Sequence, residues 1–180
     1  MSPKRICIYG GPGSGKSTVA AWLFASMKAK GEEIEYITEY AKSWTFLRRP
    51  PAGFDQVYLF GKQMNREDIV LRYSNKFMIV TDSPLFLSCC YAEKYETIGW
   101  PHLWGIAKEF EQVYPSINIV LKRPDTYKGL ARFQDETAAR NMDSFCRESL
   151  FRRGIKFSEF SCTQTEEIGA FVELMVSRRD

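Results

Sequence analysis

The chain has 180 residues, of which 44% are hydrophobic and 26% are charged, a balance typical of a soluble globular protein. This length suits one buried core, so we expect one domain spanning residues 1–180. The net charge of +3 is too small to indicate a nucleic-acid-binding protein, and a single histidine, His102, excludes a histidine-rich metal site.

Short apolar runs alternate with longer segments of helical periodicity, which is the pattern of parallel strands joined by helices. We expect strands at 5–9, 33–38, 77–80, 117–121 and 156–160. We expect helices at 16–30, 54–74, 85–95, 103–113, 137–153 and 166–178. The order of these elements predicts a three-layer α/β/α fold around a five-stranded, mainly parallel sheet.

Three local features refine this outline. Ser83 and Pro84 are a suitable N-cap and first-turn pair for the helix at 85–95. One side of the helix at 54–74 is expected to carry Val57, Gly61, Met64, Asp68 and Leu71. The irregular segments 48–53 and 123–135 are candidates for mobile segments over a site.

Residues 10–17 read Gly-Gly-Pro-Gly-Ser-Gly-Lys-Ser and match the phosphate-binding loop G-x-x-x-x-G-K-[ST] at every position. In such a loop the backbone N–H groups point at phosphates, Lys16 contacts the β- and γ-phosphates, and the Ser17 hydroxyl binds Mg²⁺. An apolar strand precedes the loop and an amphipathic helix comes after it, as this interpretation requires. The residues expected to contact ATP here are Gly11, Pro12, Gly13, Ser14, Gly15, Lys16, Ser17 and Thr18.

The residues at the ends of the other strands indicate the class of P-loop protein. Asp82 ends the run 77–82 that contains the third strand, a position where a carboxylate can hold Mg²⁺ or its water. Ser83 comes next, whereas many motor ATPases carry a water-activating glutamate there. The segment 75–78 lacks the acid of the guanine-reading pattern Asn-Lys-x-Asp. These observations favour an NTP-dependent phosphotransferase over a motor ATPase or a GTPase switch.

A phosphotransferase also needs a carboxylate for the acceptor hydroxyl and cations around the moving phosphoryl group. Glu39 comes after the second strand and is one candidate carboxylate; Asp82 is the other, and the sequence does not decide between them. Glu39 could equally be a solvated surface acid. Arg123 is expected to contact the nucleotide, and Arg132 to act from a lid at about 123–140 or to lie on the surface. Arg140 is four residues after Glu136, a spacing typical of a surface ion pair.

Two groups of side chains have competing interpretations. Trp44, Phe46, Phe54 and Tyr58 surround the loop at 48–51 and could stack on a base or simply pack the adjacent helices. The five cysteines form no Cys-x-x-Cys pattern, so reduced thiols in a cytoplasmic protein are expected, with Cys89 and Cys90 packed in a helix. No segment is typical of a signal peptide or of a membrane span, so we expect no membrane partner.

Several short stretches resemble small P-loop kinases of bacteriophages, which are related to the kinase domain of bacterial-type nicotinamide-riboside kinases. Besides the P-loop, the stretches are Thr-Glu-Tyr-Ala-Lys at 38–42, Gly-Lys-Gln at 61–63 and Thr-Asp-Ser-Pro at 81–84. The stretch 121–140 resembles the lid of the same group, except that Ala131 interrupts the Gly-Arg pair expected next to the aromatic–glutamine pair. The resemblance implies a P-loop NTPase fold, ATP and Mg²⁺, and catalytic roles for Lys16, Glu39, Asp82 and Arg132.

The acceptor implied by the resemblance is a nucleotide-type hydroxyl. Some members of the group are similar to kinases of 5-hydroxymethyluracil in DNA, which would place this chain in phage DNA modification in the host cytoplasm. A nucleoside or deoxynucleoside-monophosphate kinase is the alternative, and an NTP-gated binding module without catalysis is the third. An open basic channel to Asp82 would suit DNA, whereas a roofed pocket would suit a mononucleotide. No motif predicts the oligomeric state.

Overall fold

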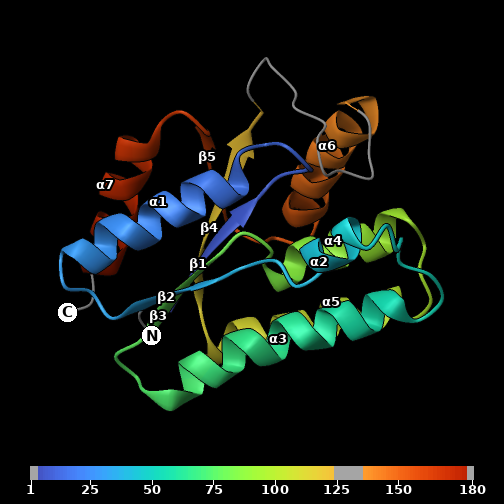
Figure 1. Ribbon diagram of the computed structural model, residues 1–180, viewed down its shortest axis with the longest axis horizontal. Helices are drawn as coiled ribbons and strands as arrows, with labels where there is room; N and C mark the ends of the chain where they lie inside the picture. The colour runs from blue at the N-terminus through green and yellow to red at the C-terminus, as the bar shows by residue number, and fades with distance from the viewer. Residues whose placement is uncertain (1–3, 124–135, 178–180) are drawn as a thin grey trace.

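A five-stranded sheet forms the centre of the protein, which we describe from a computed structural model of residues 4–123 and 136–177. The strands are β1 (Arg5–Tyr9), β2 (Ile34–Ile37), β3 (Met78–Thr81), β4 (Ser116–Lys122) and β5 (Ser158–Ser161). Their order is β2-β3-β1-β4-β5, and every pairing is parallel (Figure 1). The sequence predicted a mainly parallel sheet, and the described strands form a wholly parallel one.

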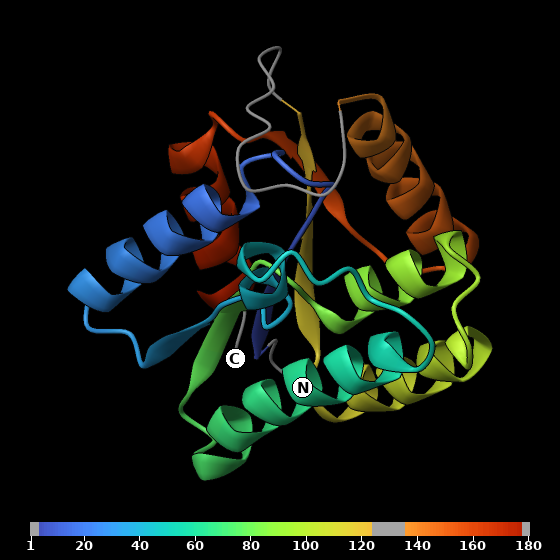
Figure 2. The same ribbon diagram turned by 45° about the vertical axis from the view of Figure 1, so that its right-hand side comes forward.

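Helices cover both faces of this sheet. They are α1 (Lys16–Ala29), α2 (Lys42–Phe46), α3 (Asp55–Tyr73), α4 (Leu85–Lys94), α5 (Trp100–Val113), α6 (Glu136–Arg152) and α7 (Thr165–Ser177). Helices α1 and α7 pack on one face, and α3 to α6 lie on the other (Figures 1 and 2). The central strand β1 serves both cores: Ile6 and Ile8 point to α1 and α7, whereas Cys7 and Tyr9 point to the opposite layer. The predicted α/β/α fold is confirmed.

Most element boundaries agree with the sequence prediction to within one or two residues. Helix α5 begins three residues earlier than expected, at Trp100, because Gly99 adopts a left-handed conformation (φ 83°) and serves as its N-cap. The short helix α2 was not predicted, since five residues carry too little periodicity to identify a helix. The structure also corrects the predicted cap of α4. Pro84 is the N-cap and no side chain caps the helix, while the Ser83 backbone N–H donates to Thr81 Oγ1.

The side of α3 that the sequence analysis described is only partly buried. Leu71 is buried, but Val57 is exposed, and the buried positions of the helix include Gln56, Gln63 and Glu67. These polar residues can be buried because their partners are buried as well. Arg5 Nε donates to Glu67 Oε2 at 2.9 Å, in an ion pair whose side chains are 1% and 0% exposed. A pattern based on hydrophobicity cannot identify such a face.

The remaining expectations about the chain as a whole concern thiols and membranes. Cys7, Cys89, Cys90 and Cys146 are buried, Cys162 is half-buried, and all five are free thiols, as the sequence predicted. Within residues 4–123 and 136–177, no helix combines the length and apolar character that a membrane span requires. Most of the expected lid, including Arg132, lies outside the described residues.

Candidate functional site

The motifs identified in the sequence meet at one edge of the sheet. Because parallel strands end at a common edge, the segments that come after β1 to β4 lie side by side there. The P-loop follows β1, Glu39 follows β2, Asp82 follows β3 and Arg123 follows β4. The fold thus brings together the residues that the sequence nominated separately.

The P-loop has the tight backbone that its glycines allow. Gly15 caps α1 with φ 89°, and a Cβ at this position would lie 2.7 Å from Cys162 Cβ. Lys16 Nζ turns back over the loop and donates to the Gly11 carbonyl at 2.9 Å. The Ser14 hydroxyl is buried and has no hydrogen-bond partner among the described residues. An unsatisfied donor in a loop of inward N–H groups fits a phosphate ligand.

Helix α6 holds the P-loop from outside through Asp143, which the sequence analysis did not single out. Asp143 Oδ1 accepts a hydrogen bond from the Gly11 N–H, and its other oxygen pairs with Arg123 Nε at 2.7 Å. Arg123 also donates to the Pro12 carbonyl at 2.7 Å. Arg123, expected to contact the nucleotide, therefore lies directly against the loop. Asp143 carries no local signal in the sequence, because its Gly11 partner is 132 positions away.

Tyr36 lies beside the predicted metal ligands Ser17 and Asp82. Asp82 is 2% exposed; its Oδ2 accepts a hydrogen bond from the Tyr36 hydroxyl at 2.9 Å and its Oδ1 accepts one from the Glu39 N–H at 3.0 Å. The Ser17 side chain is a second polar neighbour of the Tyr36 hydroxyl. Hydroxyl and carboxylate oxygens of this kind suit Mg²⁺. No group of three or more His, Cys, Asp or Glu side chains gathers as a metal site in the part of the chain that the structure describes.

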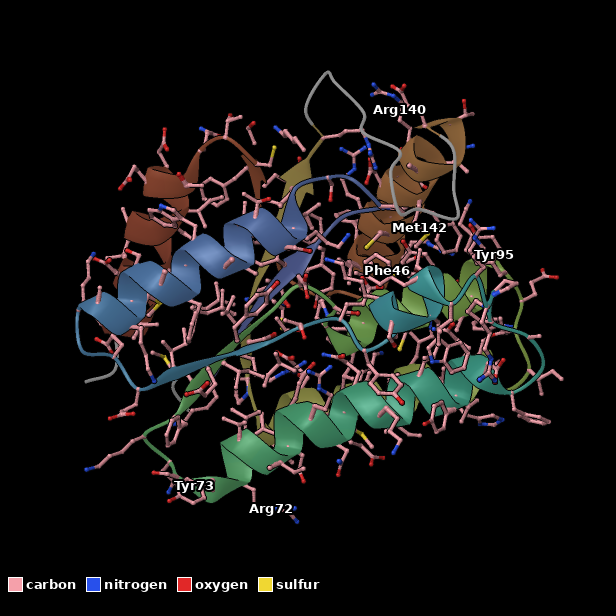
Figure 3. All side chains as sticks on the ribbon, in the orientation of Figure 1. Phe46, Arg72, Tyr73, Tyr95, Arg140 and Met142 are labelled. Carbon is pink, nitrogen blue, oxygen red and sulfur yellow. The ribbon has the colours of Figure 1, made fainter. Side chains whose placement is uncertain are left out.

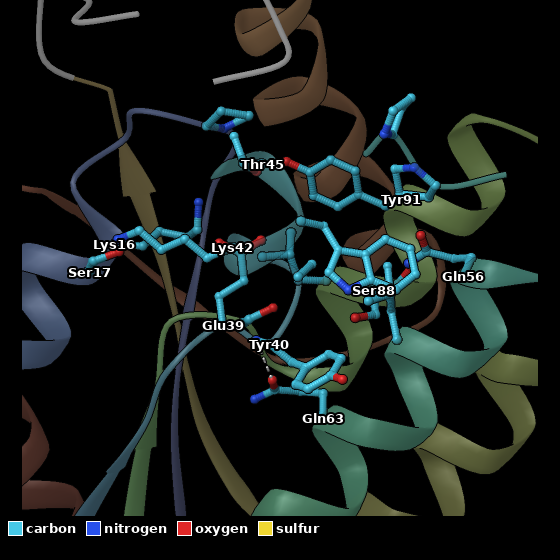
Figure 4. Close-up of a pocket in the computed structure, with 18 of the residues that line it drawn as sticks. Lys16, Ser17, Glu39, Tyr40, Lys42, Thr45, Gln56, Gln63, Ser88 and Tyr91 are labelled. Carbon is cyan, nitrogen blue, oxygen red and sulfur yellow. Dashed lines mark hydrogen bonds between the residues drawn. The ribbon is translucent and has the colours of Figure 1, made fainter. Parts of the chain in front are cut away.

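A cavity of about 420 Å³ runs from the P-loop to an aromatic end. Figure 4 shows Lys16 and Ser17 at one end, Gln56, Ser88 and Tyr91 at the other, and Glu39 between them. Other lining residues include Tyr40, Lys42, Trp44, Thr45, Pro50, Pro51, Leu59, Gln63, Leu87, Tyr95 and Thr97. The cavity therefore has room for a phosphate chain at one end and a ring at the other.

The two candidate carboxylates have different surroundings. Glu39 lines the cavity, whereas Asp82 is buried beneath Tyr36 and the Glu39 backbone. Burial raises the pKa of Tyr91, and the nearby Glu39 carboxylate raises it further, so the Tyr91 hydroxyl keeps its proton at neutral pH. Of the two, only Glu39 faces the space that a substrate could occupy.

Gln63 fixes the loop that carries Glu39. Its Oε1 accepts a hydrogen bond from the Tyr40 N–H at 3.2 Å, and its Nε2 donates to Thr81 Oγ1 at 3.3 Å. The loop after β2 is thereby tied to the end of β3 through a buried amide. This contact gives the Gly-Lys-Gln stretch a structural role that its sequence alone did not reveal.

The aromatic residues near 48–51 divide between the two interpretations of the sequence. Trp44 is 6% exposed, stacks on Tyr58 at 6.1 Å between ring centroids, and carries the Arg49 guanidinium at 3.9 Å from its ring centroid. Phe46 and Phe54 are 67% and 66% exposed. Trp44 thus packs the wall of the cavity, whereas the two phenylalanines are largely exposed and are not among its lining residues.

The expected ion pair on α6 is confirmed. Arg140 Nη2 lies 2.7 Å from Glu136 Oε1, and both side chains are about half exposed. Figure 3 shows Arg140 at the outer end of α6. This position and pairing favour the surface interpretation of Arg140.

Comparisons with known proteins agree with this geometry. A protein family described as AAA domain matches residues 5–167. A crystal structure of NadR protein in complex with NR superposes with a TM-score of 0.73 at 12% identity, covering 97% of this chain and 52% of that chain. A crystal structure of NadR protein in complex with NAD and AMP-PNP superposes with a TM-score of 0.72 at 12% identity, covering 97% of this chain and 50% of that chain. The chain thus spans about half the length of these NadR proteins. No curated protein matches it.

Proposed function

The chain belongs to the AAA domain family, and we propose that it is an ATP-dependent kinase for a hydroxyl group of a nucleoside-type acceptor. The observation that carries the proposal is the position of Glu39 between the P-loop and the aromatic end of one cavity. NadR, which has a similar kinase-like fold, has been crystallised with NR and with the ATP analogue AMP-PNP.

The P-loop end would hold ATP. Backbone N–H groups of Gly13 and residues 15–18 would bind its phosphates, and the Lys16 ammonium would follow the charge of the γ-phosphoryl group. Ser17 and Asp82 would hold Mg²⁺, which neutralises phosphate charge when bound. Lys16 must exchange its bond to the Gly11 carbonyl for a phosphate oxygen. The P-loop and Lys16 would therefore together bind the phosphates of ATP, the phosphoryl donor.

Glu39 would act on the acceptor. Its carboxylate accepts the proton of the acceptor hydroxyl as that oxygen bonds to the γ-phosphorus and the bond to the bridging oxygen of ADP breaks. Asp82 is buried and bonded through both oxygens, so the metal role suits it better. A carboxylate at this point also supports a hydroxyl acceptor over a monophosphate, because a phosphate group would be repelled by its negative charge.

The aromatic end supports a neutral ring as the rest of the acceptor. Charged side chains among the described lining residues are Lys16, Glu39 and Lys42. The distal wall offers instead the amide of Gln56, the hydroxyls of Ser88 and Tyr91, and apolar surface from Trp44 and Leu59. Such a lining suits a base or a similar heterocycle, which needs stacking and a few hydrogen bonds.

A second candidate acceptor is 5-hydroxymethyluracil within DNA. The feature that favours it is the segment 46–54, in which exposed Phe46 and Phe54 are close in sequence to Arg48 and Arg49 and whose Pro50 and Pro51 line the cavity. Exposed aromatic rings with neighbouring cations are typical of surfaces that bind single-stranded nucleic acid. In this case the hydroxymethyl group would replace a sugar hydroxyl at Glu39.

Radiolabelled ATP offered with candidate acceptors tests these alternatives. The acceptors are nucleosides including nicotinamide riboside, nucleoside monophosphates, ordinary DNA, and DNA containing hydroxymethyluracil. We expect label in a nucleoside; label confined to modified DNA would support the second candidate. Label only in monophosphates would contradict a hydroxyl acceptor. ATP binding without transfer to any acceptor would favour a non-catalytic module.

Replacing Glu39 by Gln tests the role of the carboxylate. Loss of a general base typically slows transfer by about 10²–10⁴-fold. ATP affinity should remain unchanged, because Glu39 lies outside the P-loop. Glu35→Gln is the matched control, since Glu35 lies on the preceding strand and pairs with Lys28 at a side-chain exposure of 44%. Equal kcat values for the two variants would contradict the assignment of Glu39 as the base.

A further inference from the structure

We infer that Tyr36 is a positioning residue of the Mg²⁺ site: its hydroxyl holds the Asp82 carboxylate in place for the metal. The inference rests on the proposed function, because it concerns the metal that accompanies ATP there. Tyr36 lies on β2, close to the loop of Glu39. Its hydroxyl donates to Asp82, just after β3, and the Ser17 side chain at the start of α1 is a polar neighbour of the same hydroxyl. The hydroxyl of Tyr36 is thus bonded to one predicted ligand and lies near the other.

The hydrogen bonds fix the orientation of the Asp82 carboxylate. Tyr36 donates to Oδ2 at 2.9 Å and the Glu39 N–H donates to Oδ1 at 3.0 Å, so the carboxylate does not rotate freely. Each carboxylate oxygen has two lone pairs, which leaves one on each for a metal ion or a metal-bound water.

The ring of Tyr36 has a separate packing role. It lies 6.4 Å from the Phe24 ring of α1, measured between centroids, on the apolar face of the sheet. Tyr36→Phe therefore removes the hydroxyl while leaving the ring in its place. Partners that orient a metal ligand typically change metal affinity by about 10–100-fold when they are removed.

Metal binding can be measured without any acceptor. Mn²⁺ would be titrated into the whole protein in the presence of ADP, and free Mn²⁺ followed by its electron paramagnetic resonance signal. We expect Tyr36→Phe to raise the Kd for Mn²⁺ by about 10–100-fold. ADP affinity in the absence of metal, measured by calorimetry, should remain that of the unmodified chain.

The matched control is Tyr114→Phe. The Tyr114 hydroxyl donates to Asp68 Oδ1 at 3.0 Å, the same kind of contact, and neither residue lines the cavity. This variant should bind Mn²⁺ like the unmodified protein. If both variants bind Mn²⁺ with the same affinity, the inference is wrong. The proposed kinase function would stand in that case, because phosphoryl transfer to the acceptor panel is scored separately.

A double-mutant cycle tests whether Tyr36 acts through Asp82. Asp82→Asn should weaken Mn²⁺ binding by itself, and adding Tyr36→Phe should then cause little further loss. Additive losses would contradict the inference and indicate an independent role for the hydroxyl. If the unmodified protein with ADP binds no Mn²⁺, the metal role of Ser17 and Asp82 fails together with that of Tyr36. Phosphoryl transfer to an acceptor without added metal would likewise contradict the metal role of these three residues.

Discussion

Single side chains hold the P-loop from two directions. Lys16 Nζ donates a hydrogen bond to the Gly11 carbonyl from inside the loop. Asp143, which lies on helix α6 outside the loop, accepts a hydrogen bond from the Gly11 N–H. Arg123 bridges Asp143 and the Pro12 carbonyl and is only 4% exposed. An arginine so engaged steadies the loop, and the cation that faces the cavity from the loop is therefore Lys16.

Lys16→Met should slow phosphoryl transfer by about 10²–10³-fold, the usual cost of removing one group that stabilises transition-state charge. The melting temperature should change little, because the described hydrogen bond of Lys16 lies within the loop itself. Initial rates and thermal unfolding would measure the two effects. Lys28→Met, near the other end of α1, is the control and should retain full activity. Full activity in Lys16→Met would mean that the phosphate site is misassigned.

Among the elements, α3 differs from an ordinary amphipathic helix. Its buried face carries Gln63 and Glu67, and the ion pair of Glu67 with Arg5 connects it to β1. Arg5 also pairs with Glu111 of α5 at 3.0 Å, so one guanidinium links the central strand to two helices. Helix α3 also holds the loop that carries Glu39, because Gln63 Oε1 accepts a hydrogen bond from the Tyr40 N–H.

Arg5→Met should lower the free energy of unfolding by about 3–5 kcal/mol, because it leaves the Glu67 carboxylate buried without its partner. Urea denaturation at neutral pH would measure the loss. Arg72→Met is the control, since Arg72 pairs with Asp68 across one turn of α3 and its side chain is 70% exposed. Its effect should be within experimental error. A loss in Arg5→Met no larger than in the control would contradict the importance of the buried pair.

At the scale of the whole molecule, the sheet separates two apolar cores. Cys7, Cys89, Cys90 and Cys146 all belong to the core of α3 to α6, whereas Cys162 lies at the edge of the other core, against Gly15 of the P-loop. Burial raises the pKa of Cys7 to about 12 and raises those of Cys89 and Cys90 as well. At pH 8 these three thiols remain protonated and are therefore poor nucleophiles.

A thiol titration with Ellman's reagent at pH 8 should therefore detect one fast-reacting cysteine, Cys162, in the native protein. All five should react after denaturation. Cys162→Ser identifies the reactive thiol, because its native form should show no fast phase. Two or more fast thiols in the native protein would contradict the described packing.

The sequence alone determined the features that depend on near neighbours along the chain. The P-loop was predicted from eight consecutive residues, and the five strands from short apolar runs, because glycine conformation and strand burial leave local patterns. The pairing of Arg140 with Glu136 was predicted from their spacing of four. Since parallel strands share one C-terminal edge, even the gathering of Glu39, Asp82 and Arg123 could be expected.

Only the tertiary structure decided which side chains face one another. It placed Glu39 in the cavity and Asp82 beneath it, a choice that the sequence left open because both residues come after strands. It also revealed Asp143 and Tyr36, whose partners lie 132 and 46 positions away. The buried polar face of α3 also depends on a distant residue. Glu67 can be buried because the Arg5 guanidinium, 62 positions away in the sequence, lies 2.9 Å from its carboxylate. Such contacts leave no periodic signal, because their energy depends on three-dimensional proximity and on the exclusion of water.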